Sequence, residues 1–201
     1  MRKARIDLPG LLIVGLASSM GVLAFIYPFF LPTLPSTGLA AHRQDALAIL
    51  TLLVALCLGA ILAELTWGRT DGRLVATMGV LVAVNAALRL AETTLIALPG
   101  GFSPVFLFII LCGYTFGARF GFLYGALSLL VSALVTGGVG PWLPYQMFAA
   151  GWVGMSAGWL RPLRWRGAAE RVLLALFGLA WGFLYGAILN LYFWPYATGP
   201  A

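Results

Sequence analysis

Seven apolar runs, separated by glycine, proline or charged residues, dominate the chain. Most approach the ~20 residues that an α-helix needs to cross the hydrocarbon core of a bilayer. The run after Ser103 and Pro104, the expected N-cap and first-turn pair, is shorter and predicts a tilted or partly re-entrant helix. Asp45 is the expected N-cap of the second run. The predicted spans are 11–31, 46–67, 74–98, 105–116, 120–136, a sixth that follows "GGVGPWLP" and ends at 160, and 172–192.

Composition supports an all-α integral membrane protein with a bundle of about seven transmembrane helices. Of the 201 residues, 62% are hydrophobic and 9% are charged, whereas a soluble domain carries about 25% charged residues. The net charge of +6 does not indicate nucleic-acid binding, because the basic residues lie between apolar runs and not on one face. Cys57 and Cys112 lie inside apolar runs and are expected to be small buried hydrophobes.

The basic residues fall on alternate loops, which predicts the orientation of the chain. Cytoplasmic loops of membrane proteins carry an excess of lysine and arginine. One set of loops holds nearly all of these residues, and the other set carries only Arg43. The N-terminus is therefore expected in the cytoplasm, and seven spans place the C-terminus outside. The residues on the predicted cytoplasmic side are Arg2, Lys3, Arg5, Arg69, Arg73, Arg119, Arg161, Arg164, Arg166 and Arg171.

The third span, which includes "VNAALRLAETTL", carries three polar residues on one helix face. Asn85 and Arg89 are four residues apart, and Arg89 and Glu92 are three apart. A charge in the middle of a membrane costs at least ~2.5 kcal/mol on insertion scales, and pairing reduces that cost. Two interpretations stay open: an ion pair or snorkelling arginine that serves the bundle, or one wall of a solute site that opens outward.

Aromatic and polar residues gather on the predicted outer side. The segment "TGGVGPWLPYQM" has glycines that make it pliable and prolines that make it turn. Such a segment fits an interfacial aromatic belt or a lid over an outward pocket. We predict that Arg89 and Glu92 are paired and that the 137–146 loop closes the pocket. The candidate substrate-binding residues are Asn85, Arg89, Glu92, Phe102, Trp142, Tyr145, Gln146 and Asn190.

A second face of the third span carries small residues at four-residue spacing: Gly79, Ala83 and Ala87. Small residues at this spacing let another helix approach closely. That helix belongs either to the same bundle or to a separate membrane subunit.

Several enzyme classes are disfavoured. Ser156, in "GMSAG", lies near the predicted inner side, whereas the single histidine, His42, lies in an outer loop, so a nucleophile–base pair is not expected. A seven-helix retinal protein needs a lysine in its last span, and the single lysine is Lys3. No metal-ligand cluster or phosphate-binding loop is present in the sequence. We therefore expect a protein that is not an enzyme and that holds no cofactor or metal.

Residues 76–160 resemble the substrate-binding S component of energy-coupling factor (ECF) vitamin transporters. The resemblance is carried by "ATMGVLVAVNAALRLAE", by "GGFSPVFLFIILCGYTFGARFGFLYGALSLLVSALVTGGVG" and by "PYQMFAAGWVGMSAGWL". In that family an early helix bears small residues at four-residue spacing, and a short span ends in a G-x-R-x-G turn, which Arg119 matches here. A glycine-rich outer loop and a Gly/Ala-rich span follow.

The resemblance implies a small, mostly six-helix protein that binds a vitamin or similar micronutrient near its outer face. It also implies two kinds of partner: a membrane coupling subunit (T subunit) and two cytoplasmic ATPases. The ATPases would drive toppling of the S component in a prokaryotic plasma membrane, with no ATP site on this chain. Residues 1–72 have no counterpart and predict a two-helix extension. Residues 73–201 form the S-component-like core, which has five spans and is expected to lack its last helix, through truncation or an altered architecture.

Three alternative functions follow from these features of the sequence. The first is capture of a micronutrient, possibly a bulky, cobalamin-like vitamin, as the aromatic outer side favours. The second is a structural or assembly protein of the membrane without a solute site. The third, a membrane enzyme acting on lipids or isoprenoids, is disfavoured by the shortage of catalytic groups.

Overall fold

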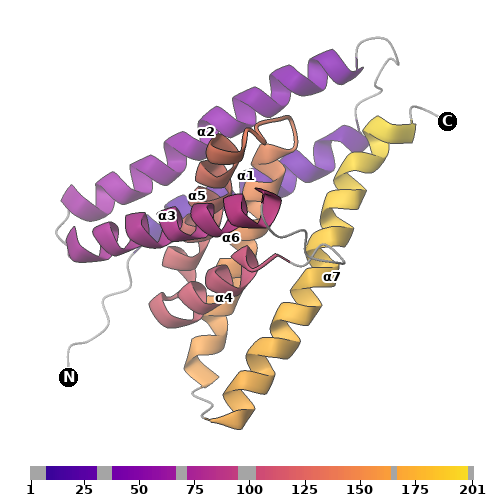
Figure 1. Ribbon diagram of the computed structural model, residues 1–201. Coiled ribbons are helices and arrows are strands. Elements are labelled where there is room, and N and C mark those ends of the chain that lie inside the picture. The colour runs from indigo at the N-terminus through magenta and orange to yellow at the C-terminus, as the bar shows by residue number, and fades with distance from the viewer. Residues whose placement is uncertain (1–7, 31–37, 67–71, 95–102, 164–166, 199–201) are drawn as a thin grey trace.

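The computed structural model describes residues 8–30, 38–66, 72–94, 103–163 and 167–198. These ranges form seven α-helices and contain no strand, as the predicted all-α class requires (Figure 1). The helices are α1 (Leu8–Ile26), α2 (Gly38–Thr66), α3 (Gly72–Thr94), α4 (Val105–Phe116), α5 (Ala118–Thr136), α6 (Leu143–Leu160) and α7 (Ala168–Thr198). Two short 3-10 turns, η1 (Tyr27–Phe29) and η3 (Arg161–Leu163), follow α1 and α6.

Among the described residues, four helices are long and apolar enough to cross a bilayer: Gln44–Leu62, Gly72–Thr94, Ala118–Thr136 and Ala168–Phe193. The apolar stretches of α1 and α4, Val14–Ile26 and Val105–Phe116, are shorter. The α4 helix has 12 residues, which at 1.5 Å per residue falls well short of the ~30 Å hydrocarbon core. The number of crossings and the orientation of the N-terminus therefore stay predictions.

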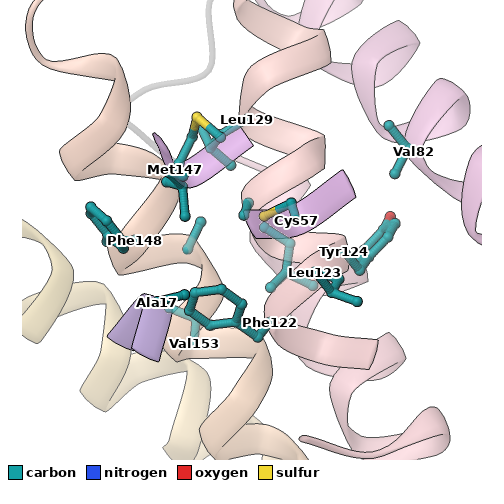
Figure 2. Packing of buried hydrophobic residues seen from close by; sticks show 14 of the residues in the cluster. Ala17, Cys57, Val82, Phe122, Leu123, Tyr124, Leu129, Met147, Phe148 and Val153 are labelled. Atoms are coloured by element: carbon teal, nitrogen blue, oxygen red, sulfur yellow. The ribbon is translucent and has the colours of Figure 1, made fainter. Parts of the chain in front are cut away.

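The centre of the molecule is the pair of helices α5 and α6, which run side by side (Figure 1). The largest fully buried side chains include Phe122, Leu123 and Tyr124 from α5 and Met147 and Phe148 from α6. Figure 2 shows these side chains together, with Tyr124 directed toward the side of Val82 on α3. The Tyr124 hydroxyl donates to the Leu81 carbonyl oxygen at 3.2 Å and so ties α5 to α3.

Glycines bring the backbones of α4, α5 and α6 into direct contact. A Cβ built on Gly113 or on Gly121 would overlap backbone atoms of Gly154, and one built on Gly154 would overlap those of Gly121. Along the same interface Gly125 faces the backbone of Ala150. This is the close packing that small residues permit between membrane helices.

The first two helices pack onto the same centre. Ala17 from α1 and Leu53 and Cys57 from α2 are buried, and Figure 2 shows Ala17 and Cys57 among the side chains of α5 and α6. The Tyr27 hydroxyl donates to a carboxylate oxygen of Asp45 at 3.1 Å and links η1, the turn that follows α1, to α2. The predicted N-cap role of Asp45 is wrong, because α2 begins at Gly38 and Asp45 lies inside it.

Two further boundaries differ from the sequence prediction. The N-cap of α4 is Pro104, whose side chain has no hydrogen-bonding group; Ser103, the predicted cap, donates its hydroxyl to Glu92 instead. The last helix, predicted for 172–192, runs from Ala168 to Thr198. The first difference changes the residue that caps α4, and the second lengthens α7. Neither changes the predicted order of the helices.

Candidate functional site

The predicted ion pair between Arg89 and Glu92 is present and includes a third residue. Arg89 Nη1 lies 3.3 Å from Glu92 Oε1 and 3.4 Å from Oε2. The same nitrogen donates to Ser103 Oγ at 3.3 Å, and Ser103 Oγ donates to Glu92 Oε2 at 2.8 Å. Because Ser103 directly precedes α4, this polar triad joins the end of α3 to the start of α4. From the sequence, Ser103 was predicted only as a helix cap, so this role was missed.

The polar triad is only partly covered by protein. The side chain of Arg89 is 36% exposed and that of Glu92 is 14% exposed. The hydrogen bonds described above use only the Nη1 group of the guanidinium, so its other N–H groups can serve as donors to a solute. Glu92 balances the charge of Arg89, which leaves the group with a formal charge of zero.

Asn85 lies one helical turn before Arg89 and is completely buried. Its Nδ2 donates to the Val105 carbonyl oxygen at 3.4 Å, a second link from α3 to the start of α4. Its Oδ1 has no hydrogen-bond partner among the residues that the structure describes. An unsatisfied buried acceptor costs about 1–3 kcal/mol, so this oxygen is a candidate acceptor for a solute hydroxyl or N–H group.

Two aromatic side chains join the start of α4 to α7. The rings of Phe106, in the first turn of α4, and Tyr185, on α7, meet edge to face with centroids 4.7 Å apart. The preceding residue, Val105, carries the carbonyl oxygen that Asn85 bonds. Three helices, α3, α4 and α7, therefore meet near the start of α4.

The other predicted site residues that the structure describes belong to the loop before α6, to α6 and to α7. Tyr145 is fully buried and stacks on Tyr192 of α7 with ring centroids 3.8 Å apart. Trp142 is about half exposed, and its Nε1 donates to the Gly138 carbonyl oxygen within its own loop at 3.3 Å. Gln146 is half-buried, Asn190 is exposed on α7, and Phe102 lies outside the described residues. A pocket that joins these residues to the polar triad stays a prediction.

Residues 73–199 match the family described as ECF transporter, substrate-specific component. The chain belongs to this family. The match begins in the first turn of α3 and ends after α7, so α1 and α2 lie outside it. Neither a curated protein nor a solved structure matches the chain. The protein is therefore the substrate-binding membrane subunit of an ECF transporter, and its apolar helices make it a multi-pass membrane protein.

In this substrate-specific component, the predicted partner residues lie on an exposed face of α3. Gly79, Ala83 and Ala87 are all exposed, and a Cβ on Gly79 would meet nothing within 4 Å. The buried side of α3 is formed by other residues, among them Val82 and Asn85. The small residues therefore do not pack inside this chain, and their face is open to lipid or to another subunit.

A second stripe of small residues, on α7, was not predicted from the sequence. Gly178, Gly182 and Gly186 recur every four residues on α7, the same spacing that drew attention to α3. A Cβ on Gly178 would lie 3.4 Å from Ile110 Cδ1, whereas Gly182 and Gly186 have nothing within 4 Å. The α7 stripe is thus a competing surface for helix docking, which a binding experiment has to distinguish from α3.

Proposed function

We propose that this substrate-specific component captures a vitamin-like micronutrient for ATP-driven uptake, and that Asn85, Arg89 and Glu92 line its binding site. The observation that carries the proposal is the buried Asn85 Oδ1, which has no partner in the described chain, one turn from a partly exposed ion pair. Burying a polar group without a partner is costly, and a bound solute would remove that cost. The family supports substrate binding by this subunit.

The chemistry of the group constrains the solute. Asn85 Oδ1 needs a hydrogen-bond donor, and the unused N–H groups of Arg89 need an acceptor. Because Glu92 neutralises Arg89, the site favours a polar solute without a large net charge. Phe106 and Tyr185 add an aromatic contact for a ring. A vitamin meets these requirements, and cobalamin is the first compound to test because exposed Trp142 could contact a bulky ligand.

A purely structural role is the second candidate, and one observation favours it. Ser103 bridges Arg89 and Glu92, so the polar triad fastens α3 to α4 whether or not a solute binds. A fastening of this kind would serve a structural or assembly protein equally well.

The double variant Arg89→Met with Glu92→Leu separates the two roles, because it removes both charges and leaves neither one unpaired. The assay is calorimetric binding of cobalamin and a panel of smaller B vitamins to the purified protein. Thr93→Ala is the matched control, since exposed Thr93 donates only to carbonyl groups of its own helix. If the pair lines the site, the double variant folds but loses the binding that the wild type and the control show. Wild-type affinity in the double variant would assign the triad to structure alone.

We further propose that the exposed face of Gly79, Ala83 and Ala87 docks a membrane coupling subunit, which itself joins two cytoplasmic ATPases. The asymmetry of the basic residues supports a cytoplasmic N-terminus in this arrangement, in the plasma membrane of a prokaryotic cell. A leucine at a close helix crossing forces the helices apart, so Ala83→Leu should abolish co-purification with the coupling subunit and spare the folding of this chain. Gly182→Leu on α7 is the control, and loss of the complex in that variant alone would move the interface to α7.

A further inference from the structure

The first helix is fitted tightly to α6. A Cβ built on Gly21 of α1 would lie 2.7 Å from Phe148 Cδ1 and 2.9 Å from Trp152 Cζ2. Trp152 Nε1 donates to Ser18 Oγ at 3.3 Å, one turn earlier on α1. The helix therefore contacts α6 through a glycine and a hydrogen bond, as an integral part of the bundle does.

At the end of α1, Phe25 lies at the junction of three helices. Its ring centroid is 5.1 Å from that of Tyr145 on α6 and 6.0 Å from that of Tyr192 on α7, both edge to face. Tyr145 and Tyr192 stack on each other, so Phe25 covers the edge of a stacked pair. A third contact, to Trp152 at 5.6 Å, fixes the ring from the α6 side.

This junction continues into the 137–142 loop. The Tyr192 hydroxyl donates to the Pro141 carbonyl oxygen at 3.4 Å. The other hydrogen bonds described for the loop stay within it or reach the helix end beside it: Gly138 N to Ala133 O, Leu143 N to Gly140 O, Gln146 N to Trp142 O, and Trp142 Nε1 to Gly138 O. Tyr192 is thus the described link from this loop to a distant helix.

We infer that α1 is a positioning element for the 137–142 loop: Phe25 holds the stacked pair of Tyr145 and Tyr192, and Tyr192 in turn holds Pro141. The helix lies outside residues 73–199, the part of the chain that matches the family. The N-terminal extension therefore helps to fix the position of the loop, through a contact that the matched segment alone does not contain. This inference is independent of the solute and of the role of the polar triad.

The test measures how fast a cysteine in the loop reacts with a water-soluble maleimide. Pro141→Cys is suitable, because position 141 is partly covered in the folded protein and the substitution keeps the backbone carbonyl that Tyr192 bonds. The two native cysteines are buried and contribute little background. In this background Phe25→Ala should raise the labelling rate by roughly threefold to tenfold, the factor expected for losing one or two aromatic pairs. Tyr192→Phe, which removes only the hydroxyl, should raise the rate by about twofold to fivefold.

Three controls separate positioning from general loosening. Leu23→Ala removes an exposed side chain of α1 and should leave the rate unchanged. A cysteine at exposed Ala169, at the start of α7, should react equally fast with and without Phe25→Ala. Phe25→Tyr keeps the ring and should restore the wild-type rate. Unchanged labelling at position 141 in folded Phe25→Ala, or equal acceleration at 141 and 169, would overturn the inference. If Phe25→Ala does not fold, the labelling rate of the loop cysteine in Tyr192→Phe is the deciding measurement. A rate equal to that with Tyr192 present would also refute the inference.

Discussion

Replacing Gly154 by alanine tests whether the centre of the bundle depends on contact between backbones. A Cβ at this position would lie 2.5 Å from the carbonyl carbon of Gly121 and 3.0 Å from its Cα. Carbon atoms in good contact are about 3.5–4.0 Å apart, so α6 would have to move away from α5 by about 1 Å. Backbone atoms of a helix cannot rotate aside as a side chain can, and the whole interface must therefore open.

The magnitude follows from what that interface contains. A gap of about 0.5–1 Å forfeits a quarter to a half of the dispersion energy between facing atoms. The side chains that would lose contact, among them Phe122, Leu123, Met147 and Phe148, are fully buried. Overpacked cores commonly lose about 1–3 kcal/mol, and backbone-on-backbone overlap puts Gly154→Ala at the upper end, about 3 kcal/mol. For a chain of this size that corresponds to a melting temperature lower by about 6–12 °C.

The assay uses Cys57 and Cys112, which are buried in the folded protein and react with a thiol-sensitive fluorophore on unfolding. The control is Gly186→Ala on α7, where a Cβ meets nothing within 4 Å. Alanine favours a helix over glycine by up to about 1 kcal/mol, so the control should melt no lower than the wild type. A Gly154→Ala protein that melts within about 2 °C of the wild type would refute the backbone-contact argument.

Three further predictions use the same protein. Glu92→Leu alone should lower stability by about 1–2 kcal/mol, because it strands a partly buried Arg89 cation, and adding Arg89→Met should restore most of the loss; equal melting temperatures for the single and double variants would contradict this. Tyr124→Phe removes the hydroxyl bonded to the α3 backbone and should cost about 0.5–1.5 kcal/mol, read as a lower melting temperature. A cysteine at Gly138 should react with an impermeant reagent from outside intact cells, and one at Arg161 only after permeabilisation; the reverse pattern would overturn the proposed orientation.

Several features of the fold follow directly from the sequence. Apolar runs predicted all seven helices, because a chain in a bilayer must satisfy its backbone hydrogen bonds within each segment. The Arg89–Glu92 pair follows from a three-residue spacing on a helix. The four-residue spacing predicted that Gly79, Ala83 and Ala87 share one face of a helix, and all three are exposed on α3; docking of another subunit on this face stays a prediction.

Other features depend on contacts between distant segments, which one sequence does not reveal. Ser103 resembled an ordinary helix cap, and only the approach of α3 turns its hydroxyl toward Glu92. An aromatic residue near a membrane interface suits a loop or a core equally well, so Tyr145 was predicted for a pocket, whereas its ring is stacked on Tyr192. Residues 1–72 were interpreted as an extension because the resembling family has no counterpart for them, and no local pattern in the sequence shows that Gly21 fits against Phe148.

The Arg89–Glu92 pair also has an electrical consequence. Moving one elementary charge through the full membrane potential involves about 2.3 kcal/mol per 100 mV. A lone Arg89 would therefore make any reorientation of α3 in the bilayer sensitive to voltage. With Glu92 only 3.3 Å away, the two charges move together as a small dipole, and the electrical work largely cancels. The membrane field then neither drives nor opposes such a movement at this point of the helix, and its energy has to come from another source.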